Sequence, residues 1–415
     1  MAMIQHPQSA TTVFLDQPPS CLEFCPEAPD HFIVGTYLLS ETKSEDGEIQ
    51  QSKTGSLQLW KLDPTTKALS QIQRIAVPYA VFDLHFHPKY KDLFAIASSV
   101  GSVALFQVST DFSGNASTAS PRITQLWTKQ VHEDPSIPAL FLAWAPQNWF
   151  PRPAADGFAV TFSDSRTSVF GTEGDIHDED SVVEWGTYEA KQMIEVWFVA
   201  LSTAAGNPEA GKDQSTTPFM FTGNDFGSLH MRRFDNTTEL DDPDEHVSPL
   251  LLEHDDRARH HTAGVTAILP LSVPMVDDAP IVLTGSYDES LRVYHATRRG
   301  EILAEQGLDG GVWRLQLLDT TEVPGSDGSE WRFLVLASCM HAGTRLVRVT
   351  CKQQDGTAEW DIEVLAKFTE HESMNYASGV WEGGKVSRKT AGAFELLCVS
   401  SSFYDRRLCV WTVNL

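Results

Sequence analysis

The chain has no long apolar segment and no secretion signal near its start. No run of about 18 apolar residues, the length that spans a bilayer as a helix, occurs in it. The first twenty residues lack the basic start and apolar middle of a signal peptide. These absences exclude a transmembrane helix and predict a soluble intracellular protein with no membrane partner.

Basic residues are scarce. The 31 lysines and arginines stand against 56 aspartates and glutamates, which gives a formal charge of -25. Such a chain repels a phosphate backbone, so nucleic acid is excluded as a direct partner. Much of the acidity lies in three polar segments that we predict to be solvated loops, residues 41–50, 171–184 and 235–245.

Cysteines are few, and motifs for metals and cofactors are missing. The six cysteines are scattered through strand-like runs, which predicts reduced packing residues rather than disulfides. One cluster, His260-His261 with Asp255 and Asp256, has the residue types of a metal site, but we interpret it as a surface loop. The chain has no Gly-x-Ser-x-Gly elbow, phosphate loop or His-Glu-x-x-His motif, so we predict no metal and no cofactor.

What the chain has instead is one repeated β unit, and long helical periods are absent. Each copy consists of an apolar run, a turn of Gly, Ser, Asp or Asn, and a second run that ends in or near an aromatic residue. The seven second runs are residues 56–60, 102–108, 166–170, 228–234, 290–295, 344–349 and 407–413. The first runs are residues 32–38, 93–97, 158–162, 218–222, 281–284, 333–337 and 396–399.

A repeat of this kind predicts a β-propeller. Copies after the first lie about 55 to 64 residues apart, and a four-stranded β unit buries its faces only against neighbouring units. The fragments 285–294 and 402–411 are similar to WD-repeat hairpins. We therefore predict an all-β, seven-bladed WD-repeat propeller, a monomer with one domain over residues 1–415.

The positions of these strand pairs predict where the first and fourth strands of each blade lie. First strands are predicted near Cys21, Val81, Phe141, Met193, Val265, Val312 and Ser378, and fourth strands near Ile72, Ile123, Val182, Pro249, Ile302 and Ile362. Blade seven then lacks a fourth strand. Residues 11–16, with the sequence Thr-Thr-Val-Phe-Leu-Asp, are predicted to supply it and to remove an exposed sheet edge.

Unusual side chains fall at corresponding places in blades five, six and seven. The turns between second and third strands hold Tyr287, Asp288, Cys339, Met340, His341, Tyr404 and Asp405. The links that enter first strands hold Gly311, Trp313, Arg314, His371 and Tyr376. Both kinds of connection lie on the same face of a propeller with this strand order, so we predict a polar site on that face.

Several of these residues also have a structural explanation. Asp288 and Asp405 can cap their hairpin turns. His371 stands where WD repeats often carry a structural histidine before the first strand. Trp313 can pack between blades, and Arg314 can form a structural ion pair. A histidine in a hairpin turn, at position 341, has no comparable explanation.

Five runs resemble a known family. They are Gly35-Thr36-Tyr37-Leu38, Gly285-Ser286-Tyr287-Asp288, Gly310-Gly311-Val312-Trp313-Arg314, Cys339-Met340-His341 and Ser402-Phe403-Tyr404-Asp405. In these runs the chain resembles the diphthine methyl-ester hydrolases, WD-repeat enzymes of diphthamide biosynthesis. The resemblance implies removal of the methyl ester from diphthine methyl ester, a modified histidine of translation elongation factor 2, to give diphthine.

The implied substrate carries a trimethylammonium group near the ester. Aromatic faces in an acidic field hold such a cation well. The candidate substrate-binding residues are Trp313, Tyr287, Tyr376 and Tyr404 for the aromatic faces, and Asp288 for the field. Arg314, or a backbone N–H, is the candidate donor to the oxyanion that forms in the reaction.

Ester hydrolysis also needs a group that activates the attacking oxygen near neutral pH. Histidine has a suitable pKa, so His341 or His371 is the candidate base that activates water, with Asp405 as the carboxylate that orients or stabilises it. A covalent alternative uses Ser402, or less readily Cys339, as the nucleophile. Sequence spacing does not separate these mechanisms.

A second interpretation is a scaffold that binds proteins on its rim without catalysis. On fold alone this interpretation is favoured, because a fold does not specify a chemistry. The run Cys-Met-His in a hairpin turn favours the enzyme, since a scaffold has no need for it.

Overall fold

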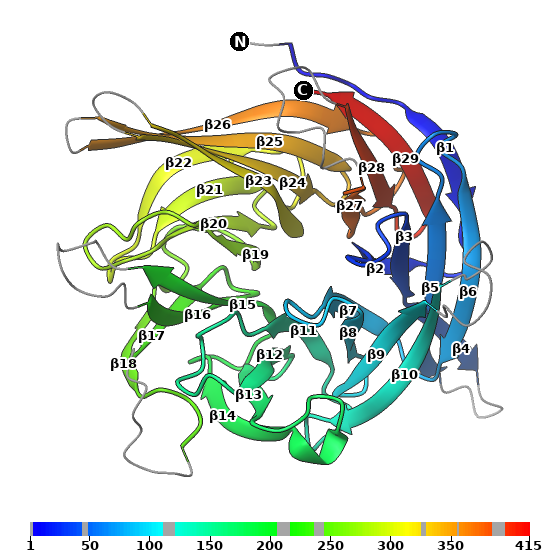
Figure 1. Ribbon diagram of the computed structural model, residues 1–415, viewed down its shortest axis with the longest axis horizontal. Helices are drawn as coiled ribbons and strands as arrows, with labels where there is room; N and C mark the ends of the chain where they lie inside the picture. The colour runs from blue at the N-terminus through cyan, green and yellow to red at the C-terminus, as the bar shows by residue number, and fades with distance from the viewer. Residues whose placement is uncertain are drawn as a thin grey trace. The chain divides into compact units, whose positions relative to one another are not determined.

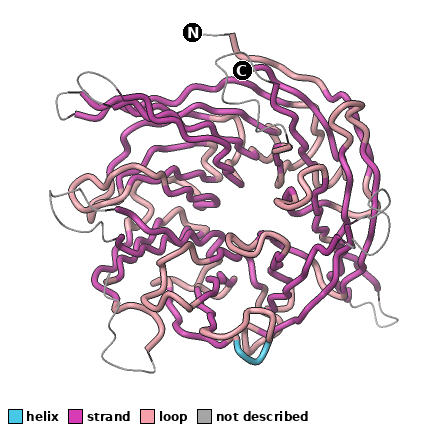
Figure 2. The backbone as a smooth tube through the Cα atoms, in the orientation of Figure 1, coloured by secondary structure: helices cyan, strands magenta, loops and turns pink. Residues whose placement is uncertain are grey.

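The computed structural model describes residues 3–43, 49–110, 121–205, 216–235, 245–324, 329–354, 357–383 and 395–415. Regular structure in these ranges is almost all strand, as Figure 2 shows, with one short 3₁₀ helix, η1, at Glu179–Ser181. No helix in these ranges is long and apolar enough to cross a membrane. The all-β prediction is confirmed.

The strands form seven antiparallel sheets, which we number as blades in chain order (Figure 1). The chain divides into two compact units. Blades three to six belong to the middle unit, built on Phe141–Leu365, and blades one, two and seven to the terminal unit, Gln5–Leu140 with Ala366–Leu415. Seven such sheets are the blades of a β-propeller, which confirms the predicted fold class. A single domain over residues 1–415 stays a prediction.

The terminal unit contains the strands predicted for its three blades. Blade one comprises β2 (Pro19–Phe24), β3 (His31–Thr36), β4 (Leu38–Lys43), β5 (Ile49–Leu62) and β6 (Leu69–Val77). Blade two comprises β7 (Val81–Phe86), β8 (Leu93–Ser98), β9 (Ser102–Thr110) and β10 (Pro121–Gln130). Blade seven comprises β27 (Ser378–Val380), β28 (Glu395–Ser401), β29 (Arg407–Asn414) and β1 (Ser9–Phe14).

The middle unit has four blades of four strands. Blade three comprises β11 (Ala139–Trp144), β12 (Asp156–Phe162), β13 (Arg166–Thr172) and β14 (Val183–Glu189). Blade four comprises β15 (Val196–Ala205), β16 (Thr216–Asn224), β17 (Leu229–Phe234) and β18 (Leu250–Asp255). Blade five comprises β19 (Val265–Pro270), β20 (Ile281–Ser286), β21 (Ser290–His295) and β22 (Glu301–Gly307). Blade six comprises β23 (Arg314–Pro324), β24 (Ser329–Ser338), β25 (Thr344–Gln354) and β26 (Thr357–Phe368).

The N-terminal strand completes blade seven, as predicted. β1 pairs antiparallel with β29, with Thr12 opposite Cys409 and Phe14 opposite Arg407, and the two strands run side by side in Figure 1. Its burial alternates along the strand, the period-two pattern of a strand with one face covered. The strand spans residues 9–14 rather than 11–16, although the Leu15 N–H still donates to the Arg406 carbonyl of the partner segment at 2.9 Å.

The predicted acidic loops are only partly loops. β4 pairs with the first part of β5, from Leu38 opposite Thr54 to Lys43 opposite Ile49, so residues 41–43 and 49–50 are strand residues of an extra hairpin. Residues 44–48 lie outside the described ranges. Segment 171–184 includes the end of β13, helix η1 and the start of β14. Most of segment 235–245, residues 236–244, is also outside the described ranges.

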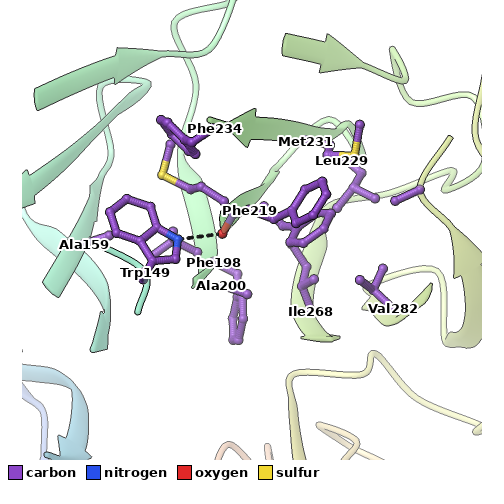
Figure 3. Close-up of a cluster of buried hydrophobic side chains, with 14 of the residues drawn as sticks. Trp149, Ala159, Phe198, Ala200, Phe219, Leu229, Met231, Phe234, Ile268 and Val282 are labelled. Carbon is purple, nitrogen blue, oxygen red and sulfur yellow. Dashed lines mark hydrogen bonds between the residues drawn. The ribbon is translucent and has the colours of Figure 1, made fainter. Parts of the chain in front are cut away.

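The core of the middle unit contains buried aromatic side chains that pack blade three against blade four (Figure 3). Trp149, in the connection between β11 and β12, is 1% exposed and packs at 5.3 Å from the ring of Phe234. Its indole N–H donates to the Phe219 carbonyl at 2.9 Å, so its one polar group is satisfied. Complete burial of a side chain of this size contributes about 3 kcal/mol.

Backbone hydrogen bonds fix the link that enters blade six. The Val312 N–H donates to the Ser286 carbonyl at 2.9 Å, at the end of β20, and the Trp313 N–H donates to the Ser338 carbonyl at 2.8 Å, at the end of β24. The link is thus held to the second strands of two adjacent blades. Both blades therefore set the position of the Trp313 side chain.

Candidate functional site

The two unusual runs of blade six pack directly on each other. A Cβ atom on Gly311 would lie 2.7 Å from Met340 Sδ, and one on Gly310 would lie 2.7 Å from Ala342 Cβ and even closer to the Cys339 carbonyl oxygen. The link that carries Gly-Gly-Val-Trp-Arg therefore needs a glycine at position 310, where it meets the backbone of the Cys-Met-His turn, while at Gly311 it faces the flexible side chain of Met340. This close approach explains why the two runs occur together in the sequence.

Replacing Gly310 by alanine is expected to lower the free energy of unfolding by about 1–3 kcal/mol, because the new Cβ overlaps backbone that has nowhere to move. Gly307→Ala is the matched control, since a Cβ there meets nothing within 4 Å and the change should stay within about 0.5 kcal/mol. Urea unfolding of the three proteins measures both effects. Equal stability of the two variants would contradict the proposed packing.

Three half-buried rings form what we call the aromatic cluster. The rings of Trp197, Tyr287 and Trp313 come from blade four, the β20–β21 turn and the link into blade six. Their centroids are 5.8 Å apart for Trp197 and Trp313, 6.0 Å for Tyr287 and Trp313, and 6.4 Å for Trp197 and Tyr287. The Trp197 indole N–H donates to Asp225 Oδ1 at 2.7 Å. The arrangement joins aromatic faces to a carboxylate, which suits a cationic ligand.

Arg314 lies against this cluster. The carbon at the centre of its guanidinium group is 4.6 Å from the Trp313 ring centre and 4.7 Å from that of Phe141. Its Nη1 donates to the carbonyls of Thr266, at 3.1 Å, and Trp313, at 2.9 Å. These contacts give Arg314 a positioning role for Trp313. They do not favour the oxyanion role, since the guanidinium donates to backbone carbonyls.

His341 is exposed at the tip of the β24–β25 turn. The turn is closed by the Cys339 N–H, which donates to the Gly343 carbonyl at 2.7 Å, and Met340 has a φ of 43°, in the left-handed region. The His341 side chain is 57% exposed, and its Nε2 is 3.9 Å from Glu289 Oε1. Glu289 belongs to the same turn as Tyr287, a member of the aromatic cluster. The exposed imidazole of His341 and its nearby carboxylate therefore come from the two blades, five and six, whose connections hold Tyr287 and Trp313.

Asp288, predicted to bind substrate, is instead part of a structural network. Its Oδ2 accepts from Arg292 Nη1 at 2.8 Å and lies 3.1 Å from His261 Nδ1, while the other ring nitrogen of His261 is 2.8 Å from the Thr284 hydroxyl. Burial opposes ionisation, but the bonds from His261 and Arg292 hold the pKa of Asp288 well below its usual value. His261 is 1% exposed, so it is not the surface-loop residue that we expected.

His371, the second candidate base, lies in the terminal unit and is 7% exposed. Its Nε2 is 2.8 Å from the Ser400 hydroxyl, which also accepts from the Trp411 indole N–H at 3.0 Å. The ring packs 5.1 Å from that of Phe368. Burial lowers the pKa of His371 to about 4. A buried, hydrogen-bonded imidazole of this kind matches the structural explanation better than the catalytic one.

Asp405 and Ser402 also lie in the terminal unit and bind each other. The Ser402 hydroxyl, 0% exposed, donates to Asp405 Oδ1, which also accepts from the Ser373 hydroxyl at 2.7 Å. Partial burial opposes ionisation, but these two bonds keep the pKa of Asp405 below its usual value. Asp405 Oδ2 accepts from the Glu372 N–H at 3.2 Å, as a turn-capping carboxylate does. The structural explanation of Asp405 therefore has direct support.

Neither candidate nucleophile has the surroundings that covalent catalysis needs. Ser402 donates its hydrogen to a carboxylate rather than to a histidine. Cys339 is 0% exposed, and burial raises its pKa to about 12, so its thiol stays protonated. The geometry favours attack by water over attack by either side chain.

The last two predicted residues, Tyr376 and Tyr404, belong to a second aromatic group in the terminal unit. Phe403 lies at its centre, with its ring 5.3 Å from Tyr376, 5.0 Å from Tyr404 and 6.0 Å from Tyr37. Burial raises the pKa of Tyr37 and of Tyr376. Tyr404 is 68% exposed, so this group presents an aromatic surface to solvent.

Sequence reasoning missed Trp197, Asp225 and Glu289. A signal was present for the first two. Asp225 follows β16 at the position that Tyr287 has after β20, and Trp197 is the second residue of β15, the first strand of blade four. The predicted site comprised connections of blades five to seven only, so these residues of blade four lay outside it. In the part of the chain that the structure describes, no group of three metal-binding side chains is close enough to hold an ion.

No protein-family model matches the chain. Two curated proteins are similar to it. The first, named diphthine methyltransferase, from Schizosaccharomyces pombe, is 33% identical over 151 residues, which cover 36% of this chain and 38% of that protein. The second, named diphthine methyltransferase homolog, from Dictyostelium discoideum, is 20% identical over 321 residues, 74% of this chain and 76% of that protein.

Solved propellers share the fold. The crystal structure of Saccharomyces cerevisiae Sqt1 matches 99% of this chain and 100% of its own, with a TM-score of 0.54 and 12% identity. Sqt1 from Chaetomium thermophilum matches 95% of this chain and 82% of its own, with a TM-score of 0.53 and 13% identity. At such identities the likeness concerns the fold alone. The chain is therefore a β-propeller and a homologue of proteins named diphthine methyltransferase.

Proposed function

We propose that this protein hydrolyses the methyl ester of diphthine methyl ester on translation elongation factor 2, in the cytoplasm, as a step of diphthamide biosynthesis. The names of the two curated relatives support a diphthine substrate. The runs Gly-Gly-Val-Trp-Arg and Cys-Met-His, which resemble the methyl-ester hydrolases and pack on each other, support hydrolysis as the reaction.

The observation that carries this proposal is the aromatic cluster beside the His341 turn. A trimethylammonium group cannot donate a hydrogen bond, so aromatic faces and a nearby negative charge are the groups that recognise it. Trp197, Tyr287 and Trp313 supply the faces, and Asp225 supplies the charge. Gly311 lies between the two parts, because a Cβ there would be 2.7 Å from Met340 Sδ and 3.4 Å from Tyr287 Cα.

In the proposed reaction His341 takes a proton from water as the oxygen adds to the ester carbonyl carbon. The tetrahedral oxyanion then collapses, the bond to the methoxy oxygen breaks, and the imidazolium returns the proton so that methanol leaves. The carboxylic acid that remains loses its proton to solvent. Glu289 Oε1 lies 3.9 Å from Nε2 of this ring. A backbone N–H of the turn is the preferred oxyanion donor, since Arg314 donates to backbone carbonyls.

The experiment incubates elongation factor 2 that carries the methyl ester with the purified full-length chain, and follows the modified peptide by mass spectrometry. Hydrolysis predicts the loss of one methylene mass and the release of methanol without any methyl donor. A gain of that mass on addition of S-adenosylmethionine would instead establish methyl transfer, the reaction in the relatives' names. An unchanged mass in both cases would contradict any activity on this substrate.

One observation favours a binding role, alone or beside catalysis. The second aromatic group, with Tyr404 68% exposed, is the kind of surface that protein partners cover. A scaffold would bind elongation factor 2 with or without the methyl ester. The mass measurement separates the two functions, because a scaffold leaves the ester intact.

A further inference from the structure

A buried arginine binds the turn that carries His341. Arg345, on β25, is 2% exposed. Its Nη1 donates to the Ala342 carbonyl at 2.7 Å, and its Nη2 donates to Asp309 Oδ2 at 3.2 Å. Asp309 directly precedes the run Gly-Gly-Val-Trp-Arg. One guanidinium group therefore joins the Cys-Met-His turn to the link that enters blade six.

Turns of this kind in blades five and seven are held in the opposite way. In blade five, Asp288 of the turn accepts from the Thr262 N–H of the link at 3.1 Å. In blade seven, Asp405 of the turn accepts from the Glu372 N–H of the link at 3.2 Å. The Cys-Met-His turn of blade six contains no carboxylate, and its support comes from the arginine and from the aspartate of the link. This turn can therefore carry His341 without a capping aspartate of its own.

Unfavourable features meet around Arg345. Asp309 has a φ of 68° and Met340 a φ of 43°, both in the left-handed region that residues with a side chain seldom adopt. The Arg345 Nε is buried, and none of the described residues accepts a hydrogen bond from it, which is costly for a charged group. Backbone strain of this kind persists where function requires it. The meeting of these features at one guanidinium favours a role in the site over a role in stability.

We propose that Arg345 is a positioning residue for His341, with Asp309 as its partner. This inference rests on the proposed ester hydrolysis and names the residues that set the place of its base. The guanidinium holds the Ala342 carbonyl to the link, so the imidazole keeps one position relative to the aromatic cluster. Arg345 acts through the backbone of the turn and does not touch the substrate. Misplacing a reacting group by about 1 Å can lower a rate by about 100-fold.

Single-turnover hydrolysis of the ester on elongation factor 2, with the full-length chain in excess, tests this role. Arg345→Met should lower the rate constant at saturation by about 10- to 100-fold and keep the half-saturating concentration within about twofold, because the aromatic cluster is unchanged. At saturation the rate constant does not depend on the fraction of folded protein. Arg345→Lys should recover part of the rate. Arg348→Met, on the same strand, loses only a half-exposed ion pair with Glu363, at 3.1 Å, and should match the wild type. Full activity in Arg345→Met, or an equal loss in Arg348→Met, would overturn the proposal.

Hydrogen exchange followed by mass spectrometry needs no substrate, so it separates this proposal from the proposed function. The Ala342 and Gly343 N–H groups donate within the turn at 2.9 and 3.1 Å. In Arg345→Met the peptide that contains them should exchange about tenfold faster, while a peptide from β24 keeps its rate. Asp309→Asn, an exposed change to a residue that tolerates the left-handed region, should give a smaller increase in a folded protein.

Unchanged exchange in both variants would overturn the role of Arg345, whether or not the ester is hydrolysed. A wild type that leaves the ester intact would contradict the proposed function, and the exchange rates alone would then decide whether Arg345 holds the turn.

Discussion

Replacing His341 by alanine is expected to lower the rate of ester hydrolysis by about 10²- to 10⁴-fold, the contribution of a general base. The fold should not change, because the side chain is 57% exposed and its recorded partner is Glu289, at 3.9 Å. Single-turnover rates measured by mass spectrometry on the ester-bearing substrate give the effect. Urea unfolding shows that the stability of the variant equals that of the wild type.

His177→Ala is the matched control for this substitution. His177 is also an exposed histidine of the middle unit, with 40% of its side chain accessible and Asp175 as its carboxylate partner at 2.6 Å. It lies between β13 and helix η1, far along the chain from the residues of the aromatic cluster. Turnover that falls equally in both variants would show a general effect of charge, and full turnover in His341→Ala would remove His341 as the base.

Replacing His371 by alanine is expected to have the opposite result. The free energy of unfolding should fall by about 2–4 kcal/mol, because the change leaves a cavity beside Phe368 and removes a buried partner of Ser400. Turnover by the folded protein should stay close to that of the wild type. Urea unfolding and single-turnover rates, both at low temperature where the variant is folded, measure the two quantities.

The pH dependence of stability gives a second readout for His371. Its pKa is about 4 in the folded protein against an ordinary 6.5, so the unfolded chain binds more protons between these values. The wild type should therefore lose up to about 3 kcal/mol of stability as the pH falls from 6.5 to 4, a component that His371→Ala lacks. His6→Ala, an exposed histidine of the same unit, should keep it. A His371 variant with normal stability and lost turnover would restore this residue as the base.

Much of the fold could be predicted from sequence, because each hairpin has a local signature. An apolar run, a tight turn and a second run determine a strand pair without help from distant residues. Each of the seven blades was predicted from one such pair. The missing fourth strand of blade seven led to β1, since an open sheet edge needs a partner. The extra hairpin of β4 and β5 was not predicted, because its polar strands carry no apolar alternation.

The roles of the site residues could not be predicted in the same way. His341 and His371 are both histidines in connections, yet one is 57% exposed and the other is buried against Ser400. Asp288 and Tyr287 are adjacent in the chain, but the carboxylate faces a structural histidine while the ring joins the aromatic cluster. Burial and hydrogen-bond partners decide such differences, and both come from residues far away in the sequence.

The sequence by itself determined the β units, their number, the N-terminal strand of blade seven and the two runs that point to diphthine chemistry, because these features depend on local pattern. Only the tertiary structure brought Trp197 and Asp225 to Tyr287 and Trp313, and placed Glu289 beside His341. Contacts between blades depend on how adjacent sheets pack. That packing involves side chains that lie tens of residues apart in the sequence. The arrangement of these side chains is therefore decided only in three dimensions.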